Sequence, residues 1–201
     1  MVTAIILAAG KSSRMGTTKQ LMKLGGEPLL QHVIEKVLTV DFSEIIAVIG
    51  HEAEQIRQSV PVEDNRFRWL INPDYATGQS TSLRHGIANC NNSGIMVFLG
   101  DEPLISEQTI QMIYRSGLAK QSASSEPFVV RPSHHSVSGH PVFFGNATKM
   151  DFTDLAGDSG AKKMIKNLAA KELIPVSDPG ILLDVDTSED YEKVKQIWQH
   201  L

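Results

Sequence analysis

Residues 7–19 combine small side chains with three positive charges, directly after an apolar run near the start of the chain. The segment reads LAAGKSSRMGTTK. The small residues at positions 8–10 let a ligand approach the backbone closely, so successive amides can bind phosphate oxygens as an anion nest. Arg14 and Lys19 would add charge, and one fixed charge about 4 Å from a phosphate contributes about 4 kcal/mol at an effective dielectric constant of about 20, before desolvation. The pattern predicts a polyphosphate site; the alternative is a tight turn whose charges are solvated.

Two familiar phosphate-binding loops do not fit this segment. Gly10-Lys11-Ser12 resembles the end of a Walker A motif, but that motif needs a glycine five residues before the Gly-Lys pair, where Ile5 stands. The dinucleotide fingerprint G-x-G-x-x-G also fails, because Ser12 takes the place of its second glycine. The segment therefore predicts a phosphate-binding loop of a third kind.

Asp101, Asp184 and Asp186 are candidates for holding a metal ion. Asp101 follows the apolar run IMVFLG, and a carboxylate at the end of a buried strand can hold Mg²⁺, which prefers carboxylates, phosphate oxygens and water. Asp184 and Asp186 lie two residues apart in LLDVDT, so in an extended chain their side chains would share one face. The alternatives are a turn or cap role for Asp101, and a cap role for Asp186 or Thr187 at the last helix.

The elements that must position these residues alternate between strand and helix. This alternation predicts a three-layer α/β fold with a mostly parallel twisted sheet flanked by helices, and one domain over residues 1–201. The region 128–144 breaks the alternation and predicts a small antiparallel element, while ligands should bind beyond the carboxyl ends of the strands. We expect strands at 3–7, 45–49, 69–71, 95–99, 128–130, 142–144 and 182–186, helices at 29–38, 52–60, 82–90, 106–118, 147–155, 160–170 and 191–201, and loops at 119–126 and 132–141.

Composition excludes several classes of protein. The 201 residues include 19 basic and 23 acidic residues, a net charge of −4, which argues against broad binding to nucleic acid or to an anionic membrane. No apolar run approaches the roughly 20 residues of a membrane span, and the N-terminus lacks the features of a signal peptide. Cys90 is the single cysteine, so we expect a cytoplasmic protein without an intrachain disulfide.

The segment LAAGKSSRMGTTKQL resembles the signature of nucleotidyltransferases that serve sugar-nucleotide and molybdenum-cofactor synthesis. It is most similar to the molybdenum cofactor cytidylyltransferase branch of the MobA-like family. The resemblance implies a Rossmann-like nucleotidyltransferase fold and a triphosphate bound by the loop, with Arg14, Lys19 and Asp101 as catalytic residues. The guanine-specific branch usually has LAGG, so Ala9 implies CTP. The nucleotide-binding residues implied at the loop are Leu7, Ala8, Ala9, Gly10, Arg14 and Lys19.

Further segments match motifs of the same family. GDEP resembles the metal motif G-D-x-P and makes Asp101 the first Mg²⁺ ligand, while DVDT resembles D-x-D-T and makes Asp186 the second, with the role of Asp184 open. In the segment 72–83, Gly78 and Ser82 match positions that touch base and ribose, although a polar turn followed by a helix cap would read the same way.

Two later segments, 139–143 and 157–161, resemble parts of the family that lie near the acceptor. After the second of these the family usually has arginine, where Lys162 stands here, and lysine cannot form the same bidentate fork. The histidines His134, His135 and His140 have no spacing typical of a zinc site, and Cys90, on an apolar helix, is expected to be a core residue rather than a nucleophile.

These residues predict nucleotidyl transfer with release of pyrophosphate. The resemblance implies CTP as the donor of CMP and a molybdopterin-type acceptor, which would support maturation of a client molybdoenzyme. Catalysis would rest on positioning and charge neutralisation by the loop, Arg14, Lys19 and Mg²⁺ on Asp101 and Asp186. Three alternatives stay open at this point. One is transfer to a sugar phosphate or polyol phosphate, another is a non-catalytic chaperone that delivers the cofactor, and the third is a P-loop kinase or NTPase, which the missing Walker glycine disfavours.

Overall fold

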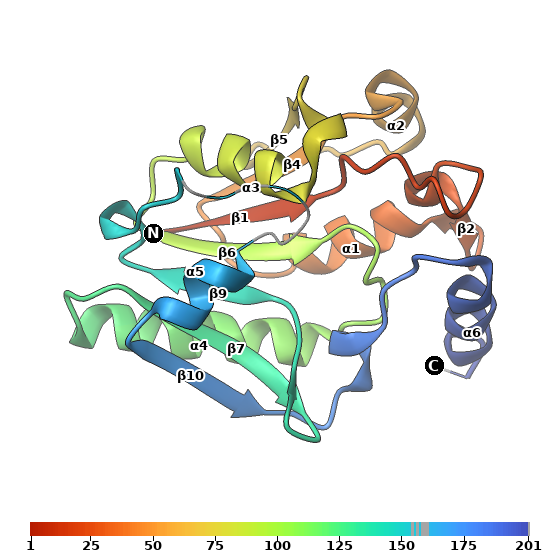
Figure 1. Cartoon of the computed structure of the whole chain (residues 1–201). Helices are drawn as coiled ribbons and strands as arrows, with labels where there is room; N and C mark the ends of the chain where they lie inside the picture. Colours follow the sequence, from red (N-terminus) through yellow and green to blue (C-terminus); the bar gives the residue numbers. More distant parts are fainter. Residues whose placement is uncertain (154, 156, 158–160, 201) are drawn as a thin grey trace.

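The computed structural model describes residues 1–153, 155, 157 and 161–200, and its centre is a twisted sheet of eight strands (Figure 1). The strands follow the order β10-β7-β9-β6-β1-β4-β5, and β8 pairs with β7 outside this path. Their bounds are β1 Val2–Leu7, β4 Glu44–Ile49, β5 Phe67–Ile71, β6 Gly94–Leu99, β7 Phe128–His134, β8 Val137–Ser138, β9 Val142–Gly145 and β10 Ala170–Pro175.

The sheet is mostly parallel, as predicted. β1 pairs in parallel with β4 and β6, β4 with β5, and β10 with β7. β9 runs antiparallel between β6 and β7, and a separate two-stranded antiparallel sheet joins β2 (Lys23–Leu24) to β3 (Glu27–Pro28). All six residues of β1 are buried, as expected for a parallel strand that is covered on both faces.

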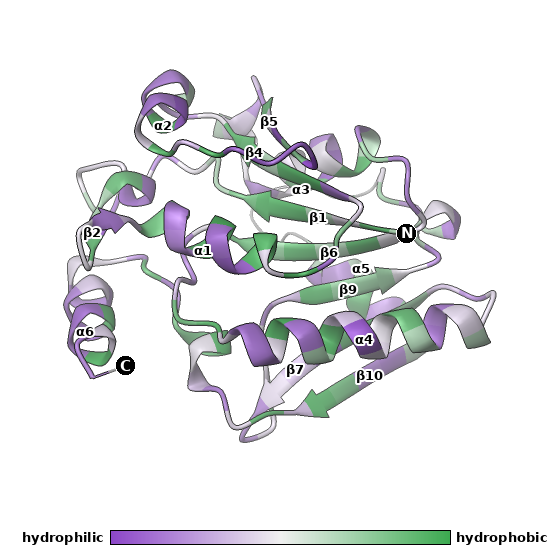
Figure 2. Cartoon of the chain, turned by 180° about the vertical axis from the view of Figure 1, so that it is seen from behind, coloured by the Kyte–Doolittle hydropathy of each residue, from purple (hydrophilic) through white to green (hydrophobic). Residues whose placement is uncertain are grey.

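Helices cover both faces of the sheet and make the predicted three layers. Apolar residues of α1, α2 and α4 pack with one face, and those of α3 and α5 pack with the other. Figure 1 shows α3 and α5 in front of the sheet, and Figure 2 shows α1 and α4 in front from the opposite side. The helices are α1 Leu29–Leu38, α2 Ala53–Ser59, α3 Gln79–Ala88, α4 Glu107–Ala123, α5 Lys162–Asn167 and α6 Ser188–Trp198, with short 3₁₀ turns at Lys19–Leu21, Tyr75–Thr77, Ala147–Lys149 and Pro179–Leu182.

The predicted strand at 182–186 is wrong. Residues 179–182 form a 3₁₀ turn, and the following residues continue without a ladder. The apolar side chains of Leu183 and Val185 instead pack into a cluster with Leu24, Leu29 and Leu104. The last strand of the sheet is β10, in a stretch whose first residue was predicted to end a helix. Because β10 is an edge strand with mostly exposed residues, it lacks the apolar pattern that identifies a buried strand.

Other boundaries move by smaller amounts. α4 continues through Ala123 into the predicted loop, because Lys120 pairs with Glu172 of β10 at 2.6 Å and Gln121 donates to Ser93 at 2.8 Å. β7 runs on to His134 and pairs with β8, so the predicted loop 132–141 is largely a hairpin. α3 begins three residues before the predicted start, and of the helix predicted at 147–155 the described residues form only a 3₁₀ turn at Ala147–Lys149.

The C-terminal helix α6 closes one end of the molecule beside β2 (Figures 1 and 2). Its side chains Tyr191, Val194, Ile197 and Trp198 pack on the same cluster as Leu24, together with Met15 and Met22 from the segment around the N-terminal loop. The predicted apolar face is therefore confirmed, apart from Leu201, which lies outside the described residues. Within the described part of the chain, every helix is too short or too polar to cross a membrane.

Candidate functional site

A cavity of about 680 Å³ lies at the carboxyl ends of β1 and β6, where the strand rule places ligands. Its lining contains every residue that the sequence assigned to the site, drawn from four separate segments of the chain. These are Leu7, Ala8, Ala9, Gly10, Arg14, Lys19, Gly78, Ser82, Asp101 and Asp186, and Asp184 lies with them.

The backbone of the N-terminal loop has its carbonyl groups occupied by the protein. Gln20 Nε2 donates to Ala8 O at 3.0 Å and to Gly10 O at 3.3 Å, and the His51 amide donates to Ala9 O at 3.2 Å. In a trans peptide the N–H points opposite to the C=O, so the next amides in the chain face away from these partners. Among the described residues, the amides of residues 9–11 have no acceptor. Three successive donors are thus available where the loop lines the cavity.

Gln20 was missed as a site residue by the sequence interpretation, although the quoted motif contains it. Its side chain is buried, with 3% of the residue exposed. Its Oε1 accepts from the Ser12 hydroxyl at 3.4 Å, and Ser12 Oγ in turn accepts from the Lys19 amide at 3.1 Å. A glutamine directly after a charged loop has no distinctive sequence signal, so only the fold identifies it as the residue that ties the loop together.

Lys19 joins the two predicted metal ligands. Its Nζ contacts Asp101 Oδ2 and donates to Asp186 Oδ1 at 2.7 Å, while Arg14 Nη1 donates to Asp186 Oδ2 at 3.1 Å. Burial is the largest single influence on the pKa of Lys19 and lowers it, but Asp101 and then Asp186 outweigh burial and raise it. The Arg14 side chain is 72% exposed, so its pair with Asp186 adds little stability.

Asp186 reaches this cluster from the residue before the cap of α6. Thr187 is the N-cap, and it forms a capping box with Asp190, which also accepts from the Asp186 amide at 3.3 Å. The predicted cap role therefore belongs to Thr187, while the Asp186 side chain is left for Lys19. A hydrogen bond of 3.0 Å from the Val185 amide to Asp101 O holds the two acidic segments side by side.

The donor set at Lys19 suits a magnesium ion. Carboxylates of Asp101 and Asp186 meet on one small cation, the Lys19 ammonium, and so lie within reach of a common ion. The described residues include no group of three or more histidine, cysteine or acidic side chains placed to hold a metal. Two carboxylates with room for phosphate oxygens and water are what Mg²⁺ takes in nucleotide sites. Asp184 lies nearby, and burial is the main cause of the raised pKa of its carboxyl.

Gly78 and Ser82 lie on the wall of the cavity formed by α3. Gly78 is the N-cap of α3 and has φ of 116°, a conformation that favours glycine. Asn72, which is buried, donates to Ser82 Oγ at 3.0 Å and to Thr81 Oγ1 at 3.1 Å. The alternative role of this segment, a turn followed by a helix cap, is therefore present in the structure. Gly78 and Ser82 also line the cavity.

The lining of the cavity divides into two groups of residues. The group that we call the loop half comprises residues 7–14, Lys19, Asp101 and Asp186. The group that we call the far half comprises Glu102, Arg131, Ser138, Gly139, His140 and Lys162. Glu102 is 5% exposed, its Oε1 lies 3.2 Å from His140 Nδ1, and its Oε2 has no partner among the described residues. Burial, only partly offset by His140, raises the pKa of Glu102.

Arg131 shapes the backbone of the far half. Its Nε and Nη2 donate to Gly139 O at 3.2 and 3.1 Å, and burial lowers its pKa, with Glu102 opposing the shift. Gly139 must be glycine, because a Cβ there would lie 2.1 Å from Ile181 O. Neither Glu102 nor Arg131 was identified from the sequence. Of the predicted acceptor segment 157–161, residues 158–160 lie outside the described residues.

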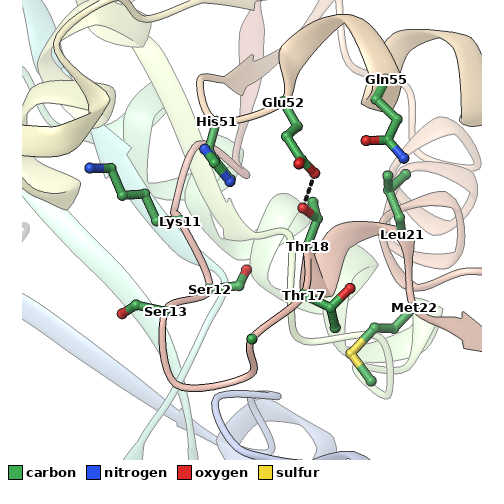
Figure 3. A pocket seen from close by; sticks show the side chains of 11 residues that line it. Lys11, Ser12, Ser13, Thr17, Thr18, Leu21, Met22, His51, Glu52 and Gln55 are labelled. Atoms are coloured by element: carbon green, nitrogen blue, oxygen red, sulfur yellow. Dashed lines mark hydrogen bonds between the residues drawn. The ribbon is translucent and has the colours of Figure 1, made fainter.

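A second cavity, of about 510 Å³, lies on the other side of the N-terminal loop and shares residues 11–13 with the first. Figure 3 shows Glu52, at the start of α2, directed toward Thr18 of the loop, and the Thr18 hydroxyl donates to Glu52 Oε2. Glu52 has φ of 49°, which is uncommon for a residue with a side chain. This contact supports the loop from within the second cavity, to which both residues belong.

The profile of the MobA-like NTP transferase domain family matches residues 4–173 of this chain. The chain belongs to this family. It is therefore a nucleotidyltransferase by family and fold, and the membership predicted from the loop motif is confirmed. The assignment to the cytidylyltransferase branch stays a prediction.

Two relatives with different names match this chain over nearly their whole length, and a third matches over part of its length. The purine catabolism protein PucB of Bacillus subtilis is 26% identical over 96% of this chain and 95% of its own. Nicotine blue oxidoreductase of Paenarthrobacter nicotinovorans is 28% identical over 94% of this chain and 93% of its own. The bifunctional protein GlmU of Desulfitobacterium hafniense is 31% identical, but the match spans 61% of this chain and only 27% of that protein.

Among solved structures, Rv0371c from Mycobacterium tuberculosis superposes with a TM-score of 0.79 at 25% identity, covering 97% of both chains. A structure of Rv0371c in complex with manganese superposes with a TM-score of 0.76 at 23% identity, covering 97% of this chain and 98% of that one. A nucleotidyl transferase from Methanothermobacter superposes with a TM-score of 0.80 at 20% identity, covering 100% of this chain and 98% of that one. Together these superpositions confirm the predicted Rossmann-like nucleotidyltransferase fold.

Proposed function

We propose that this protein transfers CMP from CTP to the phosphate of a molybdopterin-type acceptor and releases pyrophosphate. The observation that carries the proposal is that three loop amides without an acceptor among the described residues share one cavity with a lysine-bridged pair of carboxylates. Donors for a polyphosphate and ligands for its metal ion are the two requirements of nucleotidyl transfer.

The loop half would hold the triphosphate. The amides of residues 9–11 would bind its oxygens, Lys19 would exchange part of its contact with Asp101 and Asp186 for a phosphate, and Arg14 would neutralise charge at the exposed edge. Leu7 and Ala8 end the strand beneath the loop, while Gly78 and Ser82 would contact base and ribose. The presence of Ala9 in LAAG is the basis for choosing CTP.

Asp101 and Asp186 would hold Mg²⁺, which when bound supplies positive charge to the phosphates. The Rv0371c structure with manganese supports a divalent ion in a protein of this fold. Breaking the Lys19 contacts would leave two carboxylates facing each other, so the residues of this chain favour loading of ion and triphosphate together.

The chemical step needs no covalent bond to the protein. A phosphate oxygen of the acceptor would attack the α-phosphorus, the bond from that phosphorus to the bridging oxygen would break, and pyrophosphate would leave. The chain would contribute by holding the two substrates in line and by placing donors where negative charge gathers.

The far half would take the acceptor. Arg131, Lys162 and His140 offer groups that suit an anionic or polar ligand, and His140 is held by the buried carboxylate of Glu102. The acceptor could then pass to a molybdoenzyme client. A sugar or polyol phosphate acceptor and a cofactor-delivery role without catalysis are the competing proposals. The single cysteine suits the reducing cytoplasm, where we propose that the protein acts.

Pyrophosphate release from purified protein with Mg²⁺ tests these choices. CTP, GTP, ATP and UTP are each combined with molybdenum-loaded molybdopterin, with a sugar phosphate or with a polyol phosphate. We expect turnover with CTP and the pterin, and a rise in melting temperature with CTP because a ligand that binds the native state stabilises it. If turnover occurs only with a sugar phosphate or a polyol phosphate, that phosphate is the acceptor and the pterin is not. If the protein binds the pterin without turnover, the result favours the delivery role.

A further inference from the structure

We infer that Gln20 is the positioning residue of the nucleotide site: it turns the loop amides toward the triphosphate and fixes Lys19 beside them. The inference rests on the proposed function, because it assumes that the loop binds a polyphosphate. Gln20 lines the cavity, and the role assigned to it acts through the loop backbone and Ser12.

Gln20 sets the direction of two peptide groups of the loop. Gln20 uses both hydrogens of its amide nitrogen, one on Ala8 O and one on Gly10 O, at 3.0 and 3.3 Å. Each carbonyl belongs to the same planar peptide as the following amide, so the amides of Ala9 and Lys11 must point away from Gln20. A free loop could rotate these peptides, whereas the two bonds keep both donors on the side away from the protein interior.

Gln20 also fixes the backbone of Lys19, through Ser12. The carbonyl oxygen of the Gln20 side chain accepts from Ser12, and Ser12 accepts from the backbone amide of Lys19. One side chain therefore connects both ends of the loop, so the amides and the Lys19 ammonium keep a fixed relation. Ser12 has φ of 53°, a conformation that needs such support in a residue with a side chain.

Position 20 requires the hydrogen-bonding groups of a primary amide. Two carbonyls must be met by two donors and one hydroxyl by an acceptor, and a primary amide supplies that set on one planar group. Glutamate would place carboxylate oxygens against two carbonyls, and methionine would fill the space without any hydrogen bond. Since 3% of Gln20 is exposed, water cannot readily replace the lost donors.

A positioning role and a general stabilising role can be told apart by the ligands whose binding they affect. The loop amides would contact the phosphates, so weakening them should reduce the affinity for CTP and for pyrophosphate. CMP depends more on the wall around Gly78 and Ser82 and should be affected less. The difference between CTP and CMP is therefore the signature of positioning.

The test measures the Kd of CTP, pyrophosphate and CMP by calorimetry with Mg²⁺, for wild type, Gln20→Met and Gln20→Glu. Gln121→Met is the matched control, because it also removes a glutamine donor, the 2.8 Å bond to Ser93, far from the cavity. We expect at least about a tenfold loss for CTP and pyrophosphate in Gln20→Met, a larger loss in Gln20→Glu, and less than about a threefold change for CMP. The control should bind all three as wild type does.

Ser12→Ala provides a milder variant if position 20 proves intolerant, and it should give the same pattern at smaller size. An equal loss for CTP and CMP, or wild-type affinity for CTP in folded Gln20→Met, overturns the positioning role while leaving nucleotidyl transfer intact. If the wild type itself binds no nucleoside triphosphate, the proposed function fails first and the inference fails with it.

Discussion

The loop half and the far half of the cavity differ in whether their polar groups are already hydrogen-bonded within the protein. In the loop half, Lys19 is bound by Asp101 and Asp186, and the loop carbonyls are bound by Gln20 and His51. In the far half, Glu102 is almost fully buried and one of its carboxylate oxygens has no partner among the described residues. The comparison suggests that the loop half is preorganised for a part common to all nucleotide substrates, while the far half still has hydrogen bonds to make with its own ligand.

The two halves also differ in how they are assembled. Most of the loop half comes from one continuous stretch, residues 7–19, that begins at the end of the buried strand β1. The far half gathers residues from the turn after β6, from β7, from β8 and the segment that follows it, and from α5. Long-range assembly lets an acceptor site change by substitutions that leave the nucleotide site alone. The following predictions test this separation, beginning with the largest expected effect.

Asp101→Asn should lower the rate of pyrophosphate release by at least about a hundredfold, because it removes a proposed metal ligand and one of the two carboxylates that pair with Lys19. The measurement is turnover at saturating CTP and Mg²⁺. Asp151→Asn is the control, since this exposed aspartate bonds only to Thr153 among the described residues. Turnover equal to wild type in Asp101→Asn would remove Asp101 from the metal site.

Arg131→Met should raise the KM for the acceptor by about tenfold or more and leave the Kd of CTP within about twofold, because the guanidinium holds Gly139 O in the far half. The melting temperature is measured alongside, since loss of a half-buried arginine also removes packing. A matching loss of CTP affinity would show that the halves are not independent and would contradict the comparison.

The sequence predicted the loop half far better than the far half, for a physical reason. A phosphate loop needs small residues and charges close together in the chain, so Gly10, Arg14 and Lys19 are recognisable as a motif. Arg131 and Glu102 act through partners that only the fold brings near. The fold followed the same division: buried strands such as β1 carry an apolar run, whereas the exposed edge strand β10 does not, and the apolar alternation around Val185 serves a packing cluster instead of a ladder.

Ala9→Gly should change the base preference within the loop half by only a few-fold. Replacing alanine removes one methyl group from the cavity wall and yields the LAGG motif of the guanine-specific branch, so the ratio of CTP to GTP turnover should fall by about three- to tenfold. The acceptor KM should stay unchanged in the same assays. An unaltered ratio would mean that other residues select the base.

The last prediction concerns stability and not turnover, at Asp178, which supports part of the cavity wall. Its carboxylate accepts from the Ser106 amide and hydroxyl, from Thr109 and from the Gly180 amide, so it ties the start of α4 to the 3₁₀ turn whose Ile181 and Leu182 line the cavity. Burial alone would raise the pKa of Asp178, but these hydrogen bonds outweigh it and lower the pKa below the ordinary value of 3.8.

Because the folded pKa is the lower one, the Asp178 carboxylate stabilises the protein above about pH 4, and this contribution disappears as the pH falls through the folded pKa. Asp178→Asn should therefore reduce the free energy of unfolding in urea by about 1–2 kcal/mol at pH 6, with the gap from wild type closing toward pH 3. Asp151→Asn, at an exposed aspartate, should show a much smaller gap at pH 6. A gap for Asp178→Asn that stayed constant over this range would show that packing, and not the charge, accounts for its effect.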